Sequence, residues 1–544
     1  MVEGQYSIQE YKTENTEHKW DIKKLKSKHK VIAEYDFKKG KIEKGFAGKT
    51  LYVNLDTNKI SEKKVTKEMK KLFTGGRGFG LKLMWDSIKP TTRWNSKENE
   101  LVITTGPLCG TTQYPGSGKS LCLTVSPSTD IICDSNVGGF FGPYLKFAGF
   151  DAVEIQGKAK EDVVVVIDGE EGKIRIETAP LEETNSHLLA DQLTHMYAKE
   201  DTDESRQKIS VVSAGKGSEH SYWGCLNFSF YDIRRKVPRM KQAGRGGLGS
   251  VFRDKKIKAL VTKVEDFDGV ENHPADPNKL ADLGKSIHQE IREHDREQCN
   301  MRTVGTSHLV EIMDDYDLLP CENYRFGSFP KSSRIYSDQF YKLFTQVIPD
   351  GCWHGCTLAC AKTVDGYTIK TGPYKGEKVT VDGPEYETIG CCANMSIWDT
   401  LWALEFNFYC DTYGLDTIST GTAIAFYMEM YEHGILNRER CAGLELCFGN
   451  AQAVLELMHR IAEGDSDEFI KVAGKGIRRV KDWLKKKGWG DPQFIEDAGM
   501  ESKGLEFSEY VTKESLAQQG GYGLTLKGPQ HDEAWLIFID MVNK

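Results

Sequence analysis

Hydrophobic and polar positions follow two different periods along this chain, and the change comes near its middle. In the first half, short runs alternate apolar with polar residues between glycines, as strands joined by tight turns do. The segment TLYVNLDTNKI, directly after Lys49, predicts a hairpin. Further strands are predicted at ELVITTG (100–106), SLCLTVS (120–126), AVEIQG (152–157), DVVVVIDG (162–169), KIRIET (173–178), KISVVSAG (208–215) and IKALVTKV (257–264).

The second half has helical periods instead. They predict helices at 279–297, 396–411, 417–434, 451–463 and 467–487. An acidic, proline-bearing stretch, EDFDGVENHPADPNK (265–279), is typical of a linker between the halves. Strands first and helices second predict an α+β fold. We expect four segments: a polar N-terminal extension outside the core (1–45), a β-rich domain (46–264), a helical domain (265–445) and a second helical domain (446–544).

Composition narrows the class of protein. The chain has 544 residues, with 72 Lys plus Arg against 80 Asp plus Glu, a net charge of −8. This length exceeds a single ordinary domain, and the mild acidity argues against nucleic acid as a partner. The polar N-terminus lacks the apolar core of a secretory signal, and no apolar run is long enough to span a bilayer. We therefore expect a soluble cytoplasmic protein.

The chain contains 14 cysteines, which is many for a protein of this kind. A disulfide framework is excluded by size, because such frameworks belong to short secreted chains. We expect eleven to be packed thiols: Cys109, Cys122, Cys133, Cys225, Cys299, Cys321, Cys391, Cys392, Cys410, Cys441 and Cys447. Cys352, Cys356 and Cys360 form the one cluster.

The cluster DGCWHGCTLACAKTVDG (350–366) spaces its thiols by four residues, so on a helix they would share one face. Three thiolates so placed could hold three corners of an iron–sulfur cluster. A radical-SAM site has a shorter second gap. Structural zinc normally has four ligands, and His354 is the nearby histidine. Three core cysteines on a helix are the alternative.

Four glycine-rich segments in the first half could bind phosphate through backbone N–H groups, or could be ordinary turns. They are TGGRGFG (74–80), GPLCGTTQYPGSGKS (106–120), NVGGFFGPYLKFAGF (136–150) and AGRGGLG (243–249). Gly118-Lys119-Ser120 resembles the end of a P-loop, but Gln113 stands where the first glycine should be. Residues 244–249 fit G-x-G-x-x-G, but a polar, basic segment precedes them instead of a strand. A nucleotide-binding fold is therefore not expected, and an extended anionic ligand suits the four loops better.

From residue 46 onward, the chain resembles the tungsten-containing aldehyde ferredoxin oxidoreductase family. The resemblance lies in the content and order of several segments: GPLCGTT…GSGK (106–119), NVGGFFGPYLKFAGFDAVEIQGKA (136–159), AGRGGLGSVFRDKKIKAL (243–260), the cysteine cluster, GPEYET (383–388) and CDTYGLDTISTG (410–421).

This resemblance implies tungsten held by two pyranopterins (tungstopterin), Mg²⁺ bridging the pterin phosphates, and a 4Fe–4S cluster on Cys352, Cys356 and Cys360. Asn136 and Gln242 fall where backbone carbonyls meet the Mg²⁺. The other residues implied at the cofactor lie in the glycine loops and in the motif D-x-x-G-L-D: Lys119, Gly138, Lys241, Arg245, Asp411, Gly414, Leu415 and Asp416. An anionic cofactor of this size needs such amides and cations from several segments.

The resemblance also implies the activity, which is oxidation of an aldehyde to a carboxylic acid or the reverse. Electrons would pass through the cluster to ferredoxin or to an iron–sulfur partner subunit. Glu387, Glu405 and His531 are the implied catalytic residues. Motif position favours Glu387 over Glu385, and a carboxylate in the apolar stretch WALEFNFYCD around Glu405 is costly unless it has a role.

Two departures from the family pattern stand out. The first cysteine gap has three residues where the best-known members have two. The family's later motif, which carries a fourth cluster cysteine, does not follow His531 here. Three explanations stay open: a fragment, one half of a split gene whose other chain supplies the segment, or an altered cluster. An aromatic acyl-CoA reductase and a non-catalytic electron-transfer homologue are the alternative functions, and a homodimer or a hetero-oligomer is open.

Overall fold

Two mixed β-sheets carry the first half of the chain in the computed structural model, which describes residues 20–181, 183–265, 272–298, 300–345, 350–513, 515–532 and 535–537. The seven-stranded sheet has the order β1 (Val31–Asp36), β9 (Lys173–Thr178), β8 (Val163–Asp168), β13 (Ile257–Lys263), β10 (Ile209–Ser213), β11 (Leu226–Asp232), β12 (Val237–Ala243). The six-stranded sheet has the order β3 (Lys59–Lys64), β2 (Lys49–Asn54), β7 (Ala152–Gln156), β4 (Leu101–Thr105), β5 (Ser120–Val125), β6 (Ile132–Val137).

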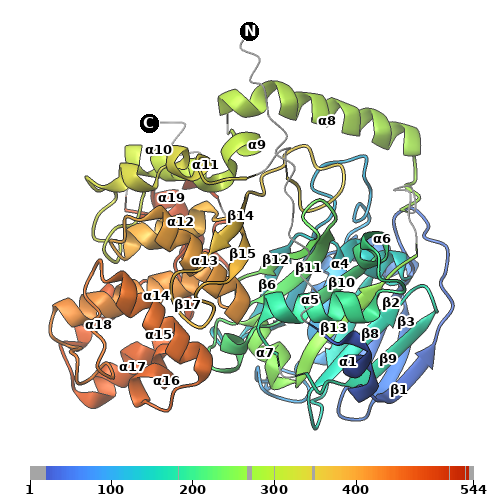
Figure 1. Ribbon diagram of the computed structural model, residues 1–544, viewed down its shortest axis with the longest axis horizontal. Helices are drawn as coiled ribbons and strands as arrows, with labels where there is room; N and C mark the ends of the chain where they lie inside the picture. Colours follow the sequence, from blue (N-terminus) through green and yellow to red (C-terminus); the bar gives the residue numbers. More distant parts are fainter. Residues whose placement is uncertain are drawn as a thin grey trace.

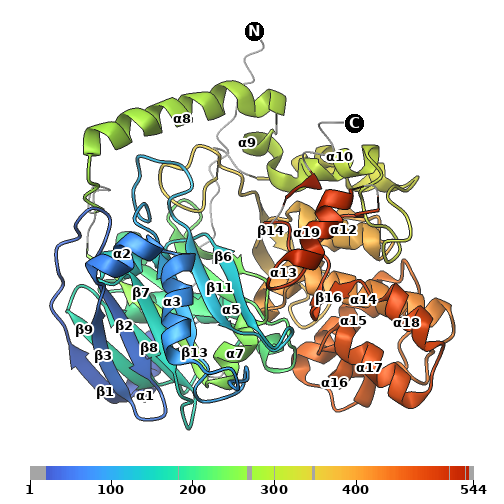
Figure 2. The same cartoon turned by 180° about the vertical axis from the view of Figure 1, so that it is seen from behind.

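Helices fill the space between the two sheets and cover their outer faces. Helices α4 (Phe141–Phe147) and α7 (Leu248–Asp254) contact strands of both sheets and share one buried apolar core with them. Helices α2 (Lys67–Phe73) and α3 (Arg77–Ser87) cover the six-stranded sheet (Figure 2). On the seven-stranded side lie α1 (Ile22–Lys28), α5 (Ser186–Tyr197) and α6 (Asp203–Gln207), with the short 3₁₀ helix η1 (Lys216–Glu219) nearby.

The second half is mainly helical. Helix α8 (Pro277–Gln298) runs above the β-rich part and leads into the helical part (Figure 1). The helices are α9 (Met301–Val304), α10 (Leu309–Asp315), α11 (Ser337–Tyr341), α12 (Tyr386–Asn394), α13 (Thr400–Tyr413), α14 (Thr417–Glu432), α15 (Ala451–Glu463), α16 (Glu468–Ala473), α17 (Ile477–Lys487), α18 (Pro492–Ala498) and α19 (Leu516–Leu524). Two small hairpins join them: β14 (Thr363–Thr368) with β15 (Lys378–Asp382), and β16 (Glu501–Ser502) with β17 (Leu505–Glu506).

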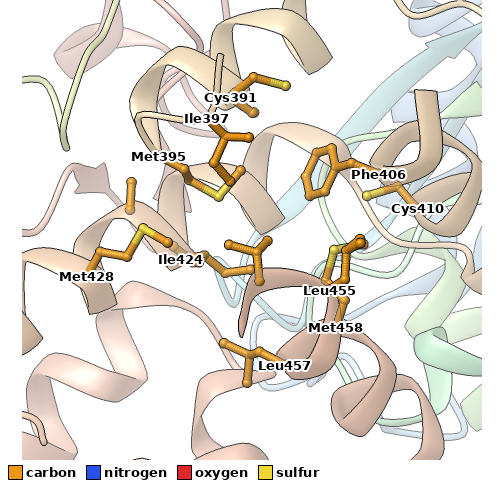
Figure 3. Close-up of a cluster of buried hydrophobic side chains, with 14 of the residues drawn as sticks. Cys391, Met395, Ile397, Phe406, Cys410, Ile424, Met428, Leu455, Leu457 and Met458 are labelled. Atoms are coloured by element: carbon orange, nitrogen blue, oxygen red, sulfur yellow. The ribbon is translucent and has the colours of Figure 1, made fainter. Parts of the chain in front are cut away.

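A single apolar cluster runs through both predicted helical domains. Figure 3 shows side chains of this cluster from α12, α13 and α14 (Cys391, Phe406 and Ile424) and from α15 (Leu455 and Met458). The cluster continues to Ile537, so α12 and the C-terminal helices are held in one packed unit. The domain boundary expected at residue 445 is not marked by a separate core and stays a prediction.

The α+β class is confirmed, and so are most predicted elements. The helical run at 467–487 is broken into α16 and α17, because Gly476 caps α17 with φ +92°. The prediction that residues 1–45 lie outside the core is wrong from residue 20 onward. Strand β1 pairs with β9, and Phe37 and Ile42 are buried. Residues 1–19 lie outside the described part of the chain, as do residues 266–271 of the expected linker, whose last residues, 277–279, begin α8.

Cysteine burial follows the prediction with one exception. Nine of the eleven expected thiols are buried, Cys447 is exposed beside the end of α14, and Cys299 lies outside the described residues. No helix among the described residues has both the length and the apolar character needed to cross a membrane.

A buried lysine fixes the loops that lead from the sheets to the site. Lys146 of α4 is fully buried and donates from Nζ to the carbonyls of Gly45 and Gly106, both at 2.6 Å. Its Nζ lies 3.7 Å from Oδ1 of Asp151, whose carboxylate accepts from the backbone of Ala47 and Gly48. Burial lowers the pKa of Lys146, so its charge depends on these acceptors.

We expect Lys146→Met to lower the free energy of unfolding by about 3 kcal/mol, because Asp151 and two carbonyls lose a buried partner. Denaturant unfolding followed by circular dichroism measures this. Lys82→Met is the control, since Lys82 pairs with Asp86 on the exposed face of α3. An equal, small loss in both variants would contradict a structural role for Lys146.

Candidate functional site

The predicted cysteine and glycine segments meet in one place. A Cβ on Gly138 would lie 2.8 Å from Sγ of Cys352 and 3.7 Å from Nζ of Lys119. The backbone N–H of Gly139 donates to the carbonyl of Cys352 at 3.1 Å, and Gly118 packs directly on Trp353. Gly138 and Gly118 therefore let the loops 106–120 and 136–140 approach the cysteines more closely than any side chain would permit.

The cysteine segment is a loop and not a helix, so its three thiols do not share a helical face. Gly355 has φ +76° and Ala359 has φ +44°, and a Cβ on Gly355 would meet the carbonyl oxygen of Thr112 at 2.1 Å. At the start of the loop, the buried carboxylate of Asp350 is held by Arg234, Arg235 and Arg239. Contacts with the β-rich part thus decide the loop's conformation, which the spacing of its thiols cannot reveal.

Cys352, Cys356 and Cys360 are all free and partly exposed. Burial raises the pKa of Cys360 to about 11, with Glu385 and Cys352 acting in the same direction and Lys241 and Lys119 opposing them. In the described part of the chain, no three His, Cys, Asp or Glu side chains are gathered closely enough to hold a metal ion. His354 packs its ring on Phe140 at 4.9 Å, as a core side chain does.

Asn136 and Gln242 lie on edge strands that face each other. Asn136 is on β6 and Gln242 on β12, the last strands of their sheets, and these two strands are in contact. Edge strands present backbone groups that no neighbouring strand takes, as the expected Mg²⁺ role requires. The side chains make other contacts: Asn136 donates to Asp532 at 3.0 Å and Gln242 to Asn227 at 3.2 Å.

A strand, β12, precedes the glycine-rich loop 243–249, although no strand was expected there. The basic segment before residue 244 is a strand, and its polarity is that of a sheet edge. It runs antiparallel to β11, so it does not form the parallel unit that a dinucleotide site requires. The exclusion of that fold therefore holds for a different reason.

The D-x-x-G-L-D motif forms the turn between α13 and α14 and docks on the β-rich part. Gly414 ends α13 with φ +66°, and its carbonyl accepts from the N–H of Cys225 at 2.8 Å. Leu415 forms an isolated antiparallel β-bridge with Gly224, and the carbonyl of Asp411 accepts from the side chain of Asn227 at 2.9 Å. Burial raises the pKa of Asp411 well above its usual range, with Asp382 adding to the effect, which favours the protonated form that can donate a hydrogen bond.

Arg245 and Asp416 form a buried ion pair that joins three segments. Nη1 of Arg245 lies 3.1 Å from Oδ2 of Asp416, which also caps α14. Nη2 donates to the carbonyls of Glu506 and Pro529. The guanidinium of Arg245 is therefore bound to protein groups, and it holds the glycine loop against the helical part. The predicted contact of Arg245 with a cofactor stays a prediction.

Lys241 lies on the site side of β12. Its ammonium donates to Asp382 and is 4.0 Å from Oε1 of Glu385. Arg239 binds the other oxygen of Asp382, so this aspartate sets the position of Lys241. Asp382 was not predicted, although it ends the strand KVTVD just before GPEYET.

Glu387 and His531 come together at the first turn of α12. Nε2 of His531 is 3.8 Å from Oε1 of Glu387, and Nδ1 is 3.3 Å from Oγ of Ser508. The ring of His531 also meets the rings of Tyr386 and Tyr510. This is the one pair of predicted catalytic residues that the structure brings into contact.

Burial moves both pKa values in the direction of the uncharged forms. The pKa of Glu387 is raised well above its usual range, with Glu385 as the second cause, and the pKa of His531 is lowered to about 4. Oε2 of Glu387 is buried without a hydrogen-bond partner. Between these two side chains the proton therefore rests on Glu387, and the imidazole of His531 is neutral.

Glu405 is predicted as catalytic, but its hydrogen bonds lead elsewhere. Its buried carboxylate accepts from Tyr367 OH at 3.2 Å, from the N–H of Lys370 at 3.3 Å and from the N–H of Thr371 at 2.6 Å. These bonds anchor the turn after β14 to α13 and satisfy a carboxylate in an apolar helix. Its catalytic role stays a prediction.

This chain is similar to known proteins over most of its length. The family model "Aldehyde ferredoxin oxidoreductase, N-terminal domain" matches residues 50–264, and "Aldehyde ferredoxin oxidoreductase, domains 2 & 3" matches residues 282–544. The tungsten-containing aldehyde ferredoxin oxidoreductase of Pyrococcus horikoshii is 32% identical over 434 residues, 79% of this chain and 66% of that protein. Its counterpart in Pyrococcus abyssi is 30% identical over 497 residues, 91% of this chain and 75% of that protein.

One further relative and one solved structure have names that state other activities. The "Aliphatic sulfonate oxidoreductase, WOR-like subunit" of Pyrococcus furiosus is 29% identical, over 80% of this chain and 67% of that protein. Among solved structures, the "Active site complex BamBC of Benzoyl Coenzyme A reductase in complex with 1,5 Dienoyl-CoA" has a TM-score of 0.67. It is 22% identical over 86% of this chain and 66% of that one, a likeness that concerns the fold alone.

We expect Gly138→Ala to lower the iron bound per chain, because the new Cβ would displace Cys352 from the loop 136–140. Iron analysis of the purified variant measures this. Gly106→Ala is the matched control, since nothing lies within 4 Å of a Cβ in this neighbouring loop. Full iron content in Gly138→Ala would remove Cys352 from the predicted cluster site.

Proposed function

Since the chain belongs to the aldehyde ferredoxin oxidoreductase family, we propose that it oxidises an aldehyde to a carboxylic acid, or runs the reverse reaction. The observation that carries this proposal is the contact between Glu387 and His531, an acid that keeps its proton beside an imidazole that stays neutral. Such a pair is suited to moving a proton at an organic substrate. The chain spans 66% of the length of its Pyrococcus horikoshii relative.

The residues of the site fit the cofactors of the family. Gly138 leaves room where a Cβ would meet Cys352, with the ammonium of Lys119 beside it and Lys241 close to Cys360. Backbone amides and two cations suit an anionic pterin, and three thiols on one loop are the donors of an iron–sulfur cluster. Asp411, as a neutral acid, could donate a hydrogen bond to a pterin ring.

In this assignment Cys352, Cys356 and Cys360 would hold a 4Fe–4S cluster, and the carbonyls of Asn136 and Gln242 would hold Mg²⁺. Lys119, Lys241 and the turn 411–416 would hold the pterins. When bound, tungsten would act as a Lewis acid toward the substrate oxygen and accept two electrons, which leave singly through the cluster.

The protein's own residues supply the proton transfer. In the oxidative direction, ionised Glu387 takes a proton from water or from the aldehyde hydrate as a general base. In the reductive direction, neutral Glu387 returns it. His531, held by Ser508, donates or accepts a hydrogen bond at the substrate oxygen, while the rings of Tyr386 and Tyr510 exclude water.

The partners of the reaction belong to the same proposal. Ferredoxin, or an iron–sulfur subunit in its place, would take the electrons. A further polypeptide segment would cover α19 and the turn after it, where Leu516, Leu524 and Leu526 are 75%, 83% and 84% exposed. A separate chain could provide that segment, and such a segment could carry the fourth cluster ligand.

Two other functions fit the same fold. An aromatic acyl-CoA reductase would share the cofactors, but no contact among the described residues favours it over aldehyde oxidation. A non-catalytic electron carrier would keep the iron and dispense with tungsten. Tungsten together with iron in the purified chain supports the enzyme, whereas iron alone supports the carrier.

We expect Glu387→Gln to lower the rate of aldehyde-dependent dye reduction by about 10²–10⁴-fold, the usual contribution of a general base. Tungsten and iron contents, measured by mass spectrometry, should stay at the wild-type level. Glu405→Gln is the comparison variant, and it should affect stability more than rate. Retained activity in Glu387→Gln would remove this residue from the mechanism.

The raised pKa of Glu387 also sets the direction of the pH dependence. The oxidative reaction needs the ionised form, so its rate should rise with pH through the neutral and alkaline range. The reductive reaction needs the protonated form, so its rate should fall over the same range. Initial rates in both directions across one pH series measure this, and parallel profiles would argue against Glu387 as the group that titrates.

A further inference from the structure

Glu509 is a buried carboxyl beside the site that no step above uses. Its side chain is fully buried and lies against α12 at Gly390. A Cβ on Gly390 would come within 2.9 Å of Cβ of Glu509 and 3.5 Å of its Oε2. Glycine at this position therefore leaves the room that the carboxyl occupies.

The two carboxyl oxygens of Glu509 differ in their hydrogen bonds. Oε1 accepts from Sγ of Cys391 at 3.2 Å and from Oγ1 of Thr422 at 3.0 Å. Oε2 is buried and has no partner among the described residues. Gly421 makes room for Cys391, since a Cβ there would meet Sγ of Cys391 at 2.4 Å. With two donors on Oε1, the proton of the neutral acid belongs on Oε2.

Helical geometry places this carboxyl next to Glu387. Gly390 follows Glu387 by three residues, and positions i and i+3 are neighbours on one helix face. Each of the two carboxyls thus has a buried Oε2 without a partner, on the same face of α12. The flanking residues of Glu509 reach the site as well, because Ser508 contacts His531 and Tyr510 contacts Tyr386.

The groups around Glu509 do little to favour a second negative charge. From α12 it faces Glu387 and Cys391, and Tyr386 lies on the same helix. Other elements contribute Asp416, Tyr324, Tyr510 and Tyr522, and the nearby cation is Arg245, already paired with Asp416. Burial raises the pKa of Glu509 to about 8, and Glu509 in turn helps to raise the pKa of Glu387.

We propose that Glu509 is a positioning residue that shares one negative charge with Glu387, so that ionisation of either carboxyl holds the proton on the other. The two carboxyls then act as one unit whose charge changes between 0 and −1 as a single proton is taken up or released. This inference rests on the proposed function of Glu387 as the acid and base. It adds a second buried carboxyl that tunes that residue's proton affinity.

The first experiment compares pH profiles of aldehyde oxidation in the wild type and in Glu509→Gln. Glutamine keeps the volume and the acceptor for Cys391 and Thr422 but carries no charge. We expect the midpoint of the rising limb to move to lower pH by about one unit, because no second carboxylate opposes ionisation of Glu387. A profile unchanged in position overturns the proposal, whatever the absolute rate.

Glu506→Gln is the matched control. Glu506 is also fully buried on the same segment, and burial raises its pKa to about 7, but its Oε1 accepts from the N–H of Ile477 and not from α12. This variant should leave the midpoint where the wild type has it. An equal shift in both variants would show that any lost buried charge acts, and would also overturn the proposal.

The second experiment needs no activity and so separates this inference from the proposed function. The folded-state pKa of Glu509 is raised from its ordinary 4.5 to about 8, so stability from this group is present at low pH and is lost as pH rises through that range. The unfolding midpoint of Glu509→Gln should therefore gain on the wild type between about pH 5 and pH 8 and stay level above. A variant less stable than the wild type at pH 8 would mean that Glu509 is ionised and merely structural, which contradicts the proposal.

Discussion

The buried ion pair between Arg245 and Asp416 is the interaction on which the rest of the site depends. Both side chains are almost completely shielded from water, and a lone charge in such a place would cost several kcal/mol. The guanidinium therefore needs every acceptor it has, and these come from distant segments: Asp416 at the start of α14, and the carbonyls of Glu506 and Pro529. Meeting that need brings the glycine loop of the β-rich part against β17, which directly precedes the segment with Ser508, and against the turn that carries His531.

Burial decides the chemistry of the site through proton positions. Glu387, Asp411 and Glu509 all hold protons more tightly than free carboxyls do, and His531 holds one less tightly. For these three acids burial favours the uncharged form, because a low dielectric penalises each charge. Asp382 and Asp416 differ from them, since each is paired with a cation: Lys241 and Arg239 bind Asp382, and Arg245 binds Asp416.

The sequence predicted well wherever a local pattern carries the information. The hairpin after Lys49 and the helix at 451–463 follow from alternation and from helical period, and the structure has both. It leaves the conformation undecided where a distant contact overrides the local pattern. The thiols at 352, 356 and 360 have helical spacing, but Thr112 and the arginines that bind Asp350 hold them in a loop. The polar segment of β12 was not predicted as a strand, because an edge strand does not need the alternating apolar pattern by which strands are recognised.

By itself the sequence determined the fold class, the family resemblance and the residues that converge on the site, since these depend on residue types in fixed order. Only the tertiary structure decided what several of those residues do. In the structure Arg245 holds the glycine loop against the helical part, and Glu405 anchors the turn after β14. Glu387 contacts His531 across about 140 residues of chain, and residue order leaves such a distant contact undetermined. It also placed Glu509 beside Glu387, because Gly390 of α12 leaves the room that this buried carboxyl occupies, and no period in the sequence records which side chain will fill it.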